Sequence, residues 1–165
     1  MSTTASPKIV TAQNALVIER IFNAPRALVW KAWTDPEAFA KWWGPKNFTG
    51  TVRKLDAKTG GSYHYGMIAA NGKTYWTVGT YIDVSPMDRI EYTDSFADEN
   101  GNPVSSTYYG MPEMPREMKV ILEFEDLESG KTKMTLRHLA VPAGEMQEMT
   151  KGGWNESFDK LEATL

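Results

Sequence analysis

Apolar and polar residues alternate along most of the chain, and this period of two is typical of strands with one buried face. In the clearest stretch, from Met118 to Phe124, apolar residues fall on one face and Lys119 and Glu123 on the other. Turn signals such as Gly60-Gly61 and Asn71-Gly72 separate consecutive segments and favour hairpins. The pattern predicts an antiparallel sheet with strands over residues 15–22, 48–56, 62–69, 73–84, 89–96, 117–126 and 131–140.

A spacing of three and four residues replaces the alternation near the C-terminus and predicts a long helix. One face of this helix would carry Met146, Met149, Thr150, Trp154, Phe158, Leu161 and Leu165. Gly152-Gly153 interrupts it, and each glycine inside a helix costs about 1 kcal/mol relative to alanine. We therefore expect either a kink or a close backbone approach at this pair.

Two short helices are predicted directly after the first strand. The first covers residues 25–34, with Asn23 as its cap and Pro25 at an early position. The second starts at Asp35-Pro36, again a cap followed by proline, and ends at Gly44-Pro45.

The chain reads as one α+β domain over residues 13–165, preceded by a flexible tail over residues 1–12. Residues 97–116 contain three prolines and no clear period. A loop of this length in a compact domain is usually functional, disordered or wrongly assigned. We expect it either to cover a cavity, with Tyr108, Tyr109, Met111 and Met114, or to form a subunit contact.

Composition narrows the classes of function. There is no cysteine, which excludes disulfides and thiolate metal sites and fits a cytoplasmic location. The net charge of −3 gives no basic footprint for nucleic acid, and no apolar run is long enough for a membrane span. With only two histidines we expect no metal, and we predict no cofactor. Six Trp, seven Tyr and six Phe must line a core, a cavity or an interface.

Three segments carry a family resemblance: residues 22–45 (FNAPRALVWKAWTDPEAFAKWWGP), 131–142 (KTKMTLRHLAVP) and 153–165 (GWNESFDKLEATL). They resemble the bacterial START-like (SRPBCC) homologues of the activator of the ninety-kilodalton heat-shock chaperone's ATPase. The resemblance implies a helix-grip fold, in which a curved antiparallel sheet of six or seven strands wraps around the long C-terminal helix. A cavity would lie between sheet and helix. The superfamily includes lipid carriers, hormone receptors, aromatases, cyclases and co-chaperones, so the fold alone does not give the function.

The alternation shows which side chains would face that cavity, and two of them are polar. Asp94 shares a face with Ile90 and Tyr92, and His138 shares one with Met134 and Leu136. Their strands would be second neighbours, about 10 Å apart, so a ligand or water could bridge the two side chains. Alternatively, both have structural roles: His138 bonds to backbone and Asp94 caps a turn.

Cavity candidates come from the inner faces of the sheet and the C-terminal helix. They are Trp30, Tyr63, Tyr65, Met67, Tyr92, Asp94, Phe96, Leu122, Leu136, His138, Trp154 and Phe158. The tryptophans of the short helices form either an aromatic box or core. The methionines form either an adaptable lining or ordinary packing: Met111, Met114, Met118, Met146 and Met149.

We favour binding of a small apolar or aromatic molecule over catalysis. An alternative is a general acid–base enzyme, aromatase-like or cyclase-like, for which His138 and Asp94 are the only pair that the sequence offers. A chaperone-associated protein-binding module is a further alternative, although the sequence alone does not support a chaperone partner. A homodimer also stays open.

Overall fold

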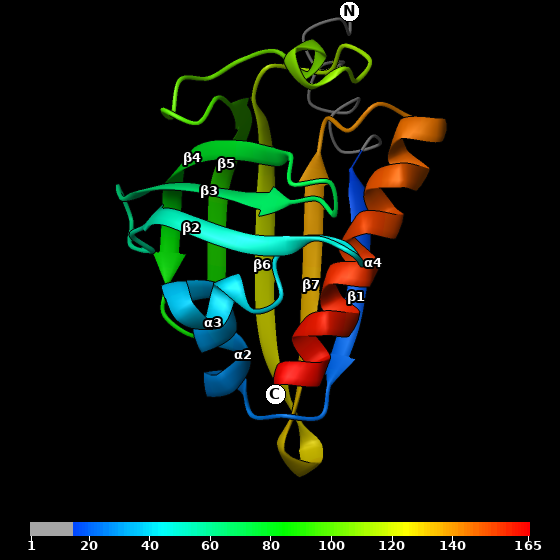
Figure 1. Cartoon of the computed structure of the whole chain (residues 1–165). Coiled ribbons are helices and arrows are strands. Elements are labelled where there is room, and N and C mark those ends of the chain that lie inside the picture. The colour runs from blue at the N-terminus through cyan, green and yellow to red at the C-terminus, as the bar shows by residue number, and fades with distance from the viewer. Residues whose placement is uncertain (1–14) are drawn as a thin grey trace, which may run out of the picture.

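The computed structural model describes residues 15–165, so the tail predicted over residues 1–12 lies outside the described residues. These residues form a seven-stranded antiparallel sheet in the order β1-β7-β6-β5-β4-β3-β2 (Figure 1). The strands are β1 (Leu16–Phe22), β2 (Thr49–Leu55), β3 (Ser62–Ile68), β4 (Thr74–Ser85), β5 (Arg89–Ala97), β6 (Met118–Leu127) and β7 (Lys131–Leu139). All seven predicted strands are confirmed to within two residues at each end.

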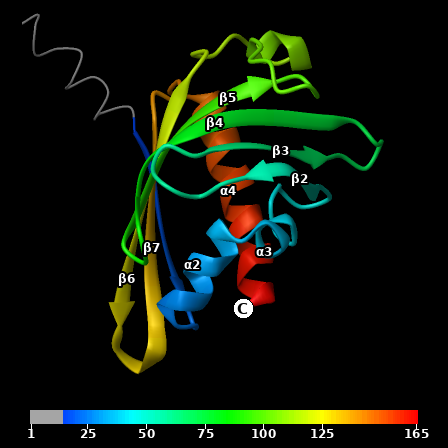
Figure 2. The same ribbon diagram turned by 90° about the vertical axis from the view of Figure 1, so that its left-hand side faces the viewer.

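The sheet curves around the long C-terminal helix α4 (Glu145–Thr164), as Figure 2 shows. The short helices α2 (Arg26–Thr34) and α3 (Pro36–Ala40) lie at one end of the sheet. The loop between β5 and β6, which contains the 3-10 turn η1 (Ser106–Tyr109), lies at the other, and a second such turn, η2 (Glu128–Gly130), joins β6 to β7. This is the predicted helix-grip arrangement. Within residues 15–165, no helix is long and apolar enough to cross a membrane.

The inner face of the sheet is the one that the alternation predicts. Met118, Val120, Leu122 and Phe124 of β6 are all buried. On β1, whose two faces both carry apolar residues in the sequence, Ile18 and Phe22 are buried. A charged residue on this inner face, Arg20, contacts α4. Its guanidinium donates to Asn155 O at 3.1 Å, pairs with Asp159 and Glu162, and lies 5.9 Å from the centre of the Phe158 ring.

The start of α2 corrects one expectation: Asn23 does not cap it. Pro25 occupies the cap position with extended backbone (φ −67°, ψ 154°) and no side-chain bond. A residue before proline avoids helical backbone, so the helix cannot begin close enough to Asn23. At α3 the expected cap is confirmed, because Asp35 accepts a hydrogen bond from Ala38 N at 3.0 Å and Pro36 follows. However, α3 ends at Ala40, earlier than predicted.

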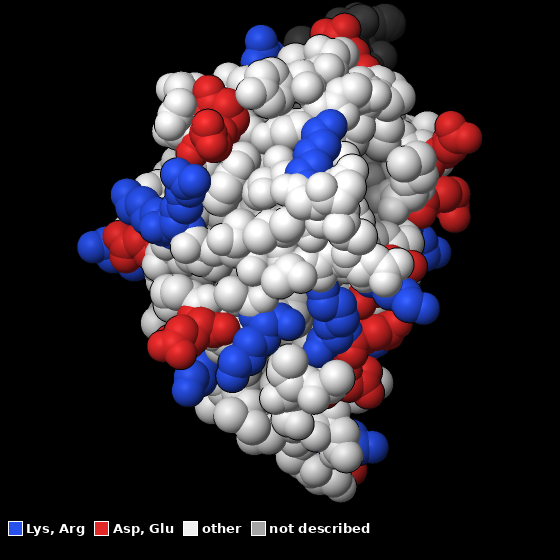
Figure 3. Space-filling model, in the orientation of Figure 1, with Lys and Arg blue, Asp and Glu red and all other residues white. Residues whose placement is uncertain are grey.

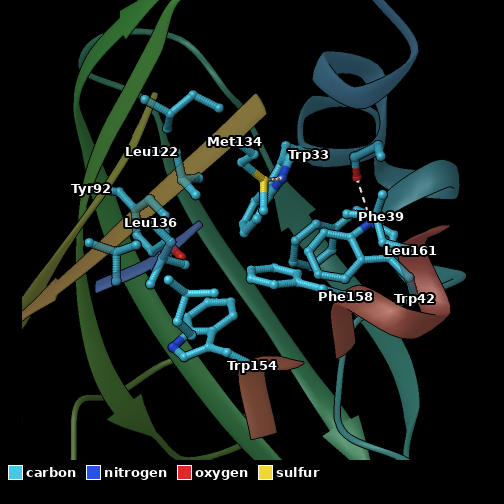
Figure 4. Packing of buried hydrophobic residues seen from close by; sticks show 14 of the residues in the cluster. Trp33, Phe39, Trp42, Tyr92, Leu122, Met134, Leu136, Trp154, Phe158 and Leu161 are labelled. Atoms are coloured by element: carbon cyan, nitrogen blue, oxygen red, sulfur yellow. Dashed lines mark hydrogen bonds between the residues drawn. The ribbon is translucent and has the colours of Figure 1, made fainter. Parts of the chain in front are cut away.

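Aromatic rings fill the interior next to α2 and α3 (Figure 4). We call Trp33, Phe39, Trp42 and Phe158 the aromatic plug. Trp33 and Trp42 meet edge to face at 4.7 Å, and Phe39 lies 5.2 Å from Trp42. Trp42 donates to Ala32 O at 2.9 Å, and Trp33 donates to the sulfur of Met134 at 3.2 Å. The N–H groups of both indole rings thus have hydrogen-bond partners, and this end of the fold is densely packed.

Helix α4 places Trp154, Phe158 and Leu161 in the core, as predicted. It runs unbroken through Gly152-Gly153. A Cβ at Gly152 would meet nothing within 4 Å, and one at Gly153 would meet only Pro45 Cγ, at an ordinary 3.6 Å. The expected close backbone approach is therefore wrong.

Gly152→Ala should raise the free energy of unfolding by about 0.5–1 kcal/mol, because alanine favours a helix and the site has room for its methyl group. Gly110 provides a matched control, since it is equally uncrowded but has φ +78°, which alanine resists. Gly110→Ala should lower stability by about 1 kcal/mol. Urea denaturation of both variants checks the prediction, which fails if Gly152→Ala is less stable than the parent.

Candidate functional site

A cavity of about 280 Å³ lies between the sheet and the N-terminal half of α4. Figure 3 shows that much of the upper front surface of the molecule, in the orientation of Figure 1, is uncharged. The residues lining the cavity come from the α3–β2 loop, the sheet, the β5–β6 loop and α4. They are Trp43, Gly44, Pro45, Met67, Thr77, Asp94, Phe96, Met111, Met114, Met118, His138, Met146, Met149, Thr150, Gly153, Trp154 and Ser157.

Methionine dominates this lining. Six of the nine methionines in the chain line the cavity, including all five singled out in the sequence. They come from β3, the β5–β6 loop, β6 and α4. Thioether side chains are flexible and polarizable, so the wall can adapt to ligands of different shape and favours contact with aromatic rings.

His138 is the first of two polar groups in the cavity wall. It is 4% exposed, and its Nδ1 accepts a hydrogen bond from Trp154 Nε1 at 3.1 Å. Because Nδ1 accepts, the proton of the neutral ring sits on Nε2. That Nε2–H is buried and has no hydrogen-bond partner. Burial lowers the pKa of His138 to about 4, so the ring is neutral at physiological pH.

Asp94 is the second polar group. Its Oδ1 accepts a hydrogen bond from Tyr63 OH at 2.9 Å. Its side chain is 22% exposed, and its Oδ2 lies 3.9 Å from His138 Nε2, too far for a hydrogen bond. Burial raises the pKa of Asp94 to about 6, against a smaller lowering by the Tyr63 bond, so the group is a carboxylate at pH 7.

These contacts agree with the structural alternative in giving each residue a partner within the protein, but the partners differ from those expected. His138 bonds to the side chain of Trp154 rather than to backbone, and Asp94 bonds to the side chain of Tyr63 rather than capping a turn. One further polar atom on each residue remains: an unpaired N–H on His138 and a carboxylate oxygen on Asp94. Both belong to cavity-lining residues.

The structure places the twelve predicted site residues in three groups. Met67, Asp94, Phe96, His138 and Trp154 line the cavity. Tyr63, Tyr65 and Tyr92 are buried beside Asp94, with the first two rings stacked at 4.1 Å. Lying in the core outside the cavity lining are Leu122, Leu136, Phe158 and Trp30, the last of which contacts Phe124.

Several lining residues were missed in the sequence. The sequence offers Trp43 only as one of the four tryptophans of the short helices, which form either an aromatic box or core. Among Trp30, Trp33, Trp42 and Trp43, only Trp43 lines the cavity. Ser157 lies three residues after Trp154, so the helical spacing could have identified it. Thr77 could not be placed from the sequence, because the aromatic residues Trp76 and Tyr81 fall on opposite faces of β4 and both are buried.

Lys160 fastens one wall of the cavity to α4. Its ammonium donates to the carbonyl oxygens of Gly44 at 2.9 Å, Pro45 at 3.3 Å and Phe48 at 2.8 Å. Burial lowers the pKa of Lys160. The three bonds hold the loop that carries Trp43, Gly44 and Pro45 against the helix, so this wall is fixed.

The β5–β6 loop forms the opposite, methionine-bearing wall. Ser106 organises it by donating to Pro112 O at 2.8 Å and accepting from Met114 N at 3.0 Å. Tyr109 is buried and anchors the loop to β4 by accepting from Trp76 N at 3.0 Å. This places Met111 and Met114 on the cavity, as the covering hypothesis requires. Tyr108 and Tyr109, which were expected to cover it as well, do not line it. The subunit-contact alternative stays a prediction.

A curved antiparallel sheet that grips a long C-terminal helix, with short helices after the first strand, defines a helix-grip protein of the START-like (SRPBCC) class. The chain belongs to the family described as Activator of Hsp90 ATPase homolog 1-like protein, whose profile matches residues 23–165. The expected family is therefore confirmed.

Solved structures extend the likeness over nearly the whole chain. Protein CV1439 from Chromobacterium violaceum is 28% identical, with a TM-score of 0.75 over 92% of this chain and 96% of that chain. A protein from Staphylococcus epidermidis is 29% identical, with a TM-score of 0.72 over 90% and 87%. Protein Ms6760 from Mycobacterium smegmatis, 24% identical, shares the fold at a TM-score of 0.76 over 94% and 92%. No functionally curated protein matches this chain.

Among residues 15–165, no three His, Asp or Glu side chains gather in a way that could hold an ion. The chemistry that the arrangement does offer is apolar burial combined with one donor and one acceptor that converge.

Proposed function

We propose that this protein binds a small apolar or aromatic molecule in the cavity between the sheet and α4. The observation that carries the proposal is the cavity itself, about 280 Å³ in volume and lined mainly by methionine and aromatic side chains. Small-molecule sites are concave, mostly apolar and equipped with a few polar groups, as this one is.

The contrast with the aromatic plug supports this proposal. Protein interiors pack densely and hold few voids larger than a water molecule, and the plug end of this fold follows that rule. The cavity is partly open to solvent, so its methionine and aromatic lining faces water rather than other protein atoms. A ligand that fills it would pack against this lining and remove apolar surface from water.

Binding of the neutral fluorescent probe N-phenyl-1-naphthylamine tests the proposal. Thr150→Trp would place a large ring in the cavity wall, whereas Lys151→Trp would place the same ring on the exposed side of the helix. We expect the parent and Lys151→Trp to bind the probe with similar affinity and Thr150→Trp to bind it at least tenfold more weakly. Absence of binding by the parent, or equal binding by both variants, would contradict the proposal.

The acid–base alternative rests on the same cavity. Burial raises the pKa of the Asp94 carboxyl group to about 6, and this group lies 3.9 Å from the neutral imidazole of His138. Two such groups are the kind of pair that can transfer a proton. Turnover at this pair would require the binding step first, so the probe experiment tests what both functions share. The chaperone partner and the homodimer stay predictions.

A further inference from the structure

We propose that the cavity selects neutral aromatic alcohols of about two fused rings, with the ligand's hydroxyl oxygen held between His138 Nε2 and Asp94 Oδ2. This inference rests on the proposed function and adds the chemical class of the ligand. The hydroxyl would accept from the imidazole N–H and donate to the carboxylate.

The first step is the unpaired donor of His138. Trp154 occupies Nδ1 and thereby fixes the proton on Nε2. Nε2 is buried without a partner, and a buried donor left unpaired is destabilising. The ring cannot turn to satisfy Nε2 without breaking the bond from Trp154. A ligand acceptor at this point therefore relieves a cost that the folded protein otherwise carries.

The second step is the distance between the two polar atoms. His138 Nε2 and Asp94 Oδ2 lie 3.9 Å apart. For an oxygen atom about 2.8 Å from each of them, the angle Nε2–O–Oδ2 would be roughly 90°. This angle suits a hydroxyl group that accepts with one lone pair and donates its own proton. An ether or a ketone can only accept, so it would leave the carboxylate oxygen unpaired.

The third step concerns charge. At pH 7 His138 is neutral and Asp94 is a carboxylate, since burial moves their pKa values to about 4 and about 6. The titratable groups around Asp94 are Tyr63 and Tyr65 on β3, Tyr92 on β5 and His138 on β7, and none is cationic at this pH. The carboxylate would therefore repel an anionic ligand, which disfavours carboxylic acids of the same size.

The fourth step is size. A cavity of ~150 Å³ lined by apolar side chains can hold one benzene molecule. The present cavity, at about 280 Å³, is nearly twice that volume and fits two fused rings. Trp43 and Trp154 line it with their ring centres 5.5 Å apart, and the methionine sulfurs offer further contacts to an aromatic ligand.

Four probes of equal ring size test the inference by calorimetry at pH 7.5: 2-naphthol, naphthalene, 2-methoxynaphthalene and 2-naphthoate. We expect 2-naphthol to bind at least tenfold more tightly than naphthalene, although the hydroxyl makes it the less apolar molecule. We expect 2-methoxynaphthalene to resemble naphthalene and 2-naphthoate to bind most weakly. Naphthalene binding as tightly as 2-naphthol would overturn the inference and leave the proposed function standing. Failure of all four probes to bind would overturn both.

Variants separate a specific role from a structural one, because the readout is the affinity ratio of 2-naphthol to naphthalene. His138→Phe and Asp94→Asn should each reduce this ratio at least fivefold, whereas loss of cavity shape would weaken both ligands equally. Glu125→Gln is the matched control, since it removes one carboxylate charge at an exposed position of β6 outside the cavity lining. An unchanged ratio in Asp94→Asn, or an equal drop in Glu125→Gln, would reject the assignment even if His138→Phe does not fold.

Discussion

Phe158→Ala should lower the free energy of unfolding by about 3–5 kcal/mol. Phe158 is fully buried, with 0% of its surface exposed, and belongs to the aromatic plug. Its ring stacks on Trp154 at 5.5 Å and lies 6.1 Å from Trp42 and 6.2 Å from Trp33. These indoles are held by their own N–H bonds, so they cannot collapse into the space that the phenyl ring leaves. The loss should therefore include most of the cavity term as well as the transfer term.

Chemical denaturation at pH 7.5 measures this effect, with Lys151→Ala as the control in the same helix. Lys151 is exposed, and its replacement should change stability by less than about 0.5 kcal/mol. If Phe158→Ala proved as stable as the control, the packing of α4 on the sheet would have to be different from that described.

The stability of Asp94→Asn relative to the parent should fall by about 2–3 kcal/mol between pH 7 and pH 4. Burial raises the pKa of Asp94 from 3.8 to about 6. A raised carboxyl pKa favours the folded state at low pH, and this contribution is lost as the pH rises through about 6. The variant lacks the titrating group, so its advantage over the parent should be largest at pH 7 and should vanish near pH 4.

His138→Gln should show the opposite slope. Burial lowers the pKa of His138 from 6.5 to about 4, so its contribution is present above pH 6.5 and is lost as the pH falls through about 4. In the parent the two contributions oppose each other. Together, Asp94 and His138 should therefore change its free energy of unfolding little between pH 7 and pH 4. Urea denaturation across this range checks both slopes, and other titrating groups cancel in the difference from the parent. Parallel curves for parent and Asp94→Asn would contradict the burial of this carboxyl group.

The sequence predicts the sheet well because β6 separates apolar from charged residues cleanly, and the inner parity then extends to Asp94 and His138. It could not predict their partners. The Trp154–His138 bond joins α4 to β7 and depends on how the helix is rotated over the sheet, which spacing alone does not set. The faces of β4 are ambiguous in the sequence for a physical reason: Tyr81 is buried on the inner face, and Trp76 is buried on the outer face against Arg53 and His64.

The site was harder to predict than the fold, because parity gives the face of a strand and not the position along it. Leu122 and Leu136 point inward as expected, yet they lie in packed core rather than on the cavity. Where filled core ends and cavity begins depends on how far the rings of α2 and α3 reach. Trp42 and Trp43 are adjacent in sequence and their rings meet edge to face at 5.6 Å, but only Trp43 reaches the cavity, because Trp42 is fully buried against Trp33 and Phe39.

The division of the interior into an aromatic plug and a methionine-lined cavity has an evolutionary consequence. The two regions meet at Trp43, which stacks on Phe39, and at Trp154, which stacks on Phe158. Met111 and Met149 lie outside the buried core, so changes at these positions should leave the packing of the plug intact. Under the proposed binding function, mutations that alter ligand choice would then seldom carry the chain below the stability that folding requires. A lineage built on this plan could exchange wall residues one at a time, while the same few aromatic rings preserve the architecture.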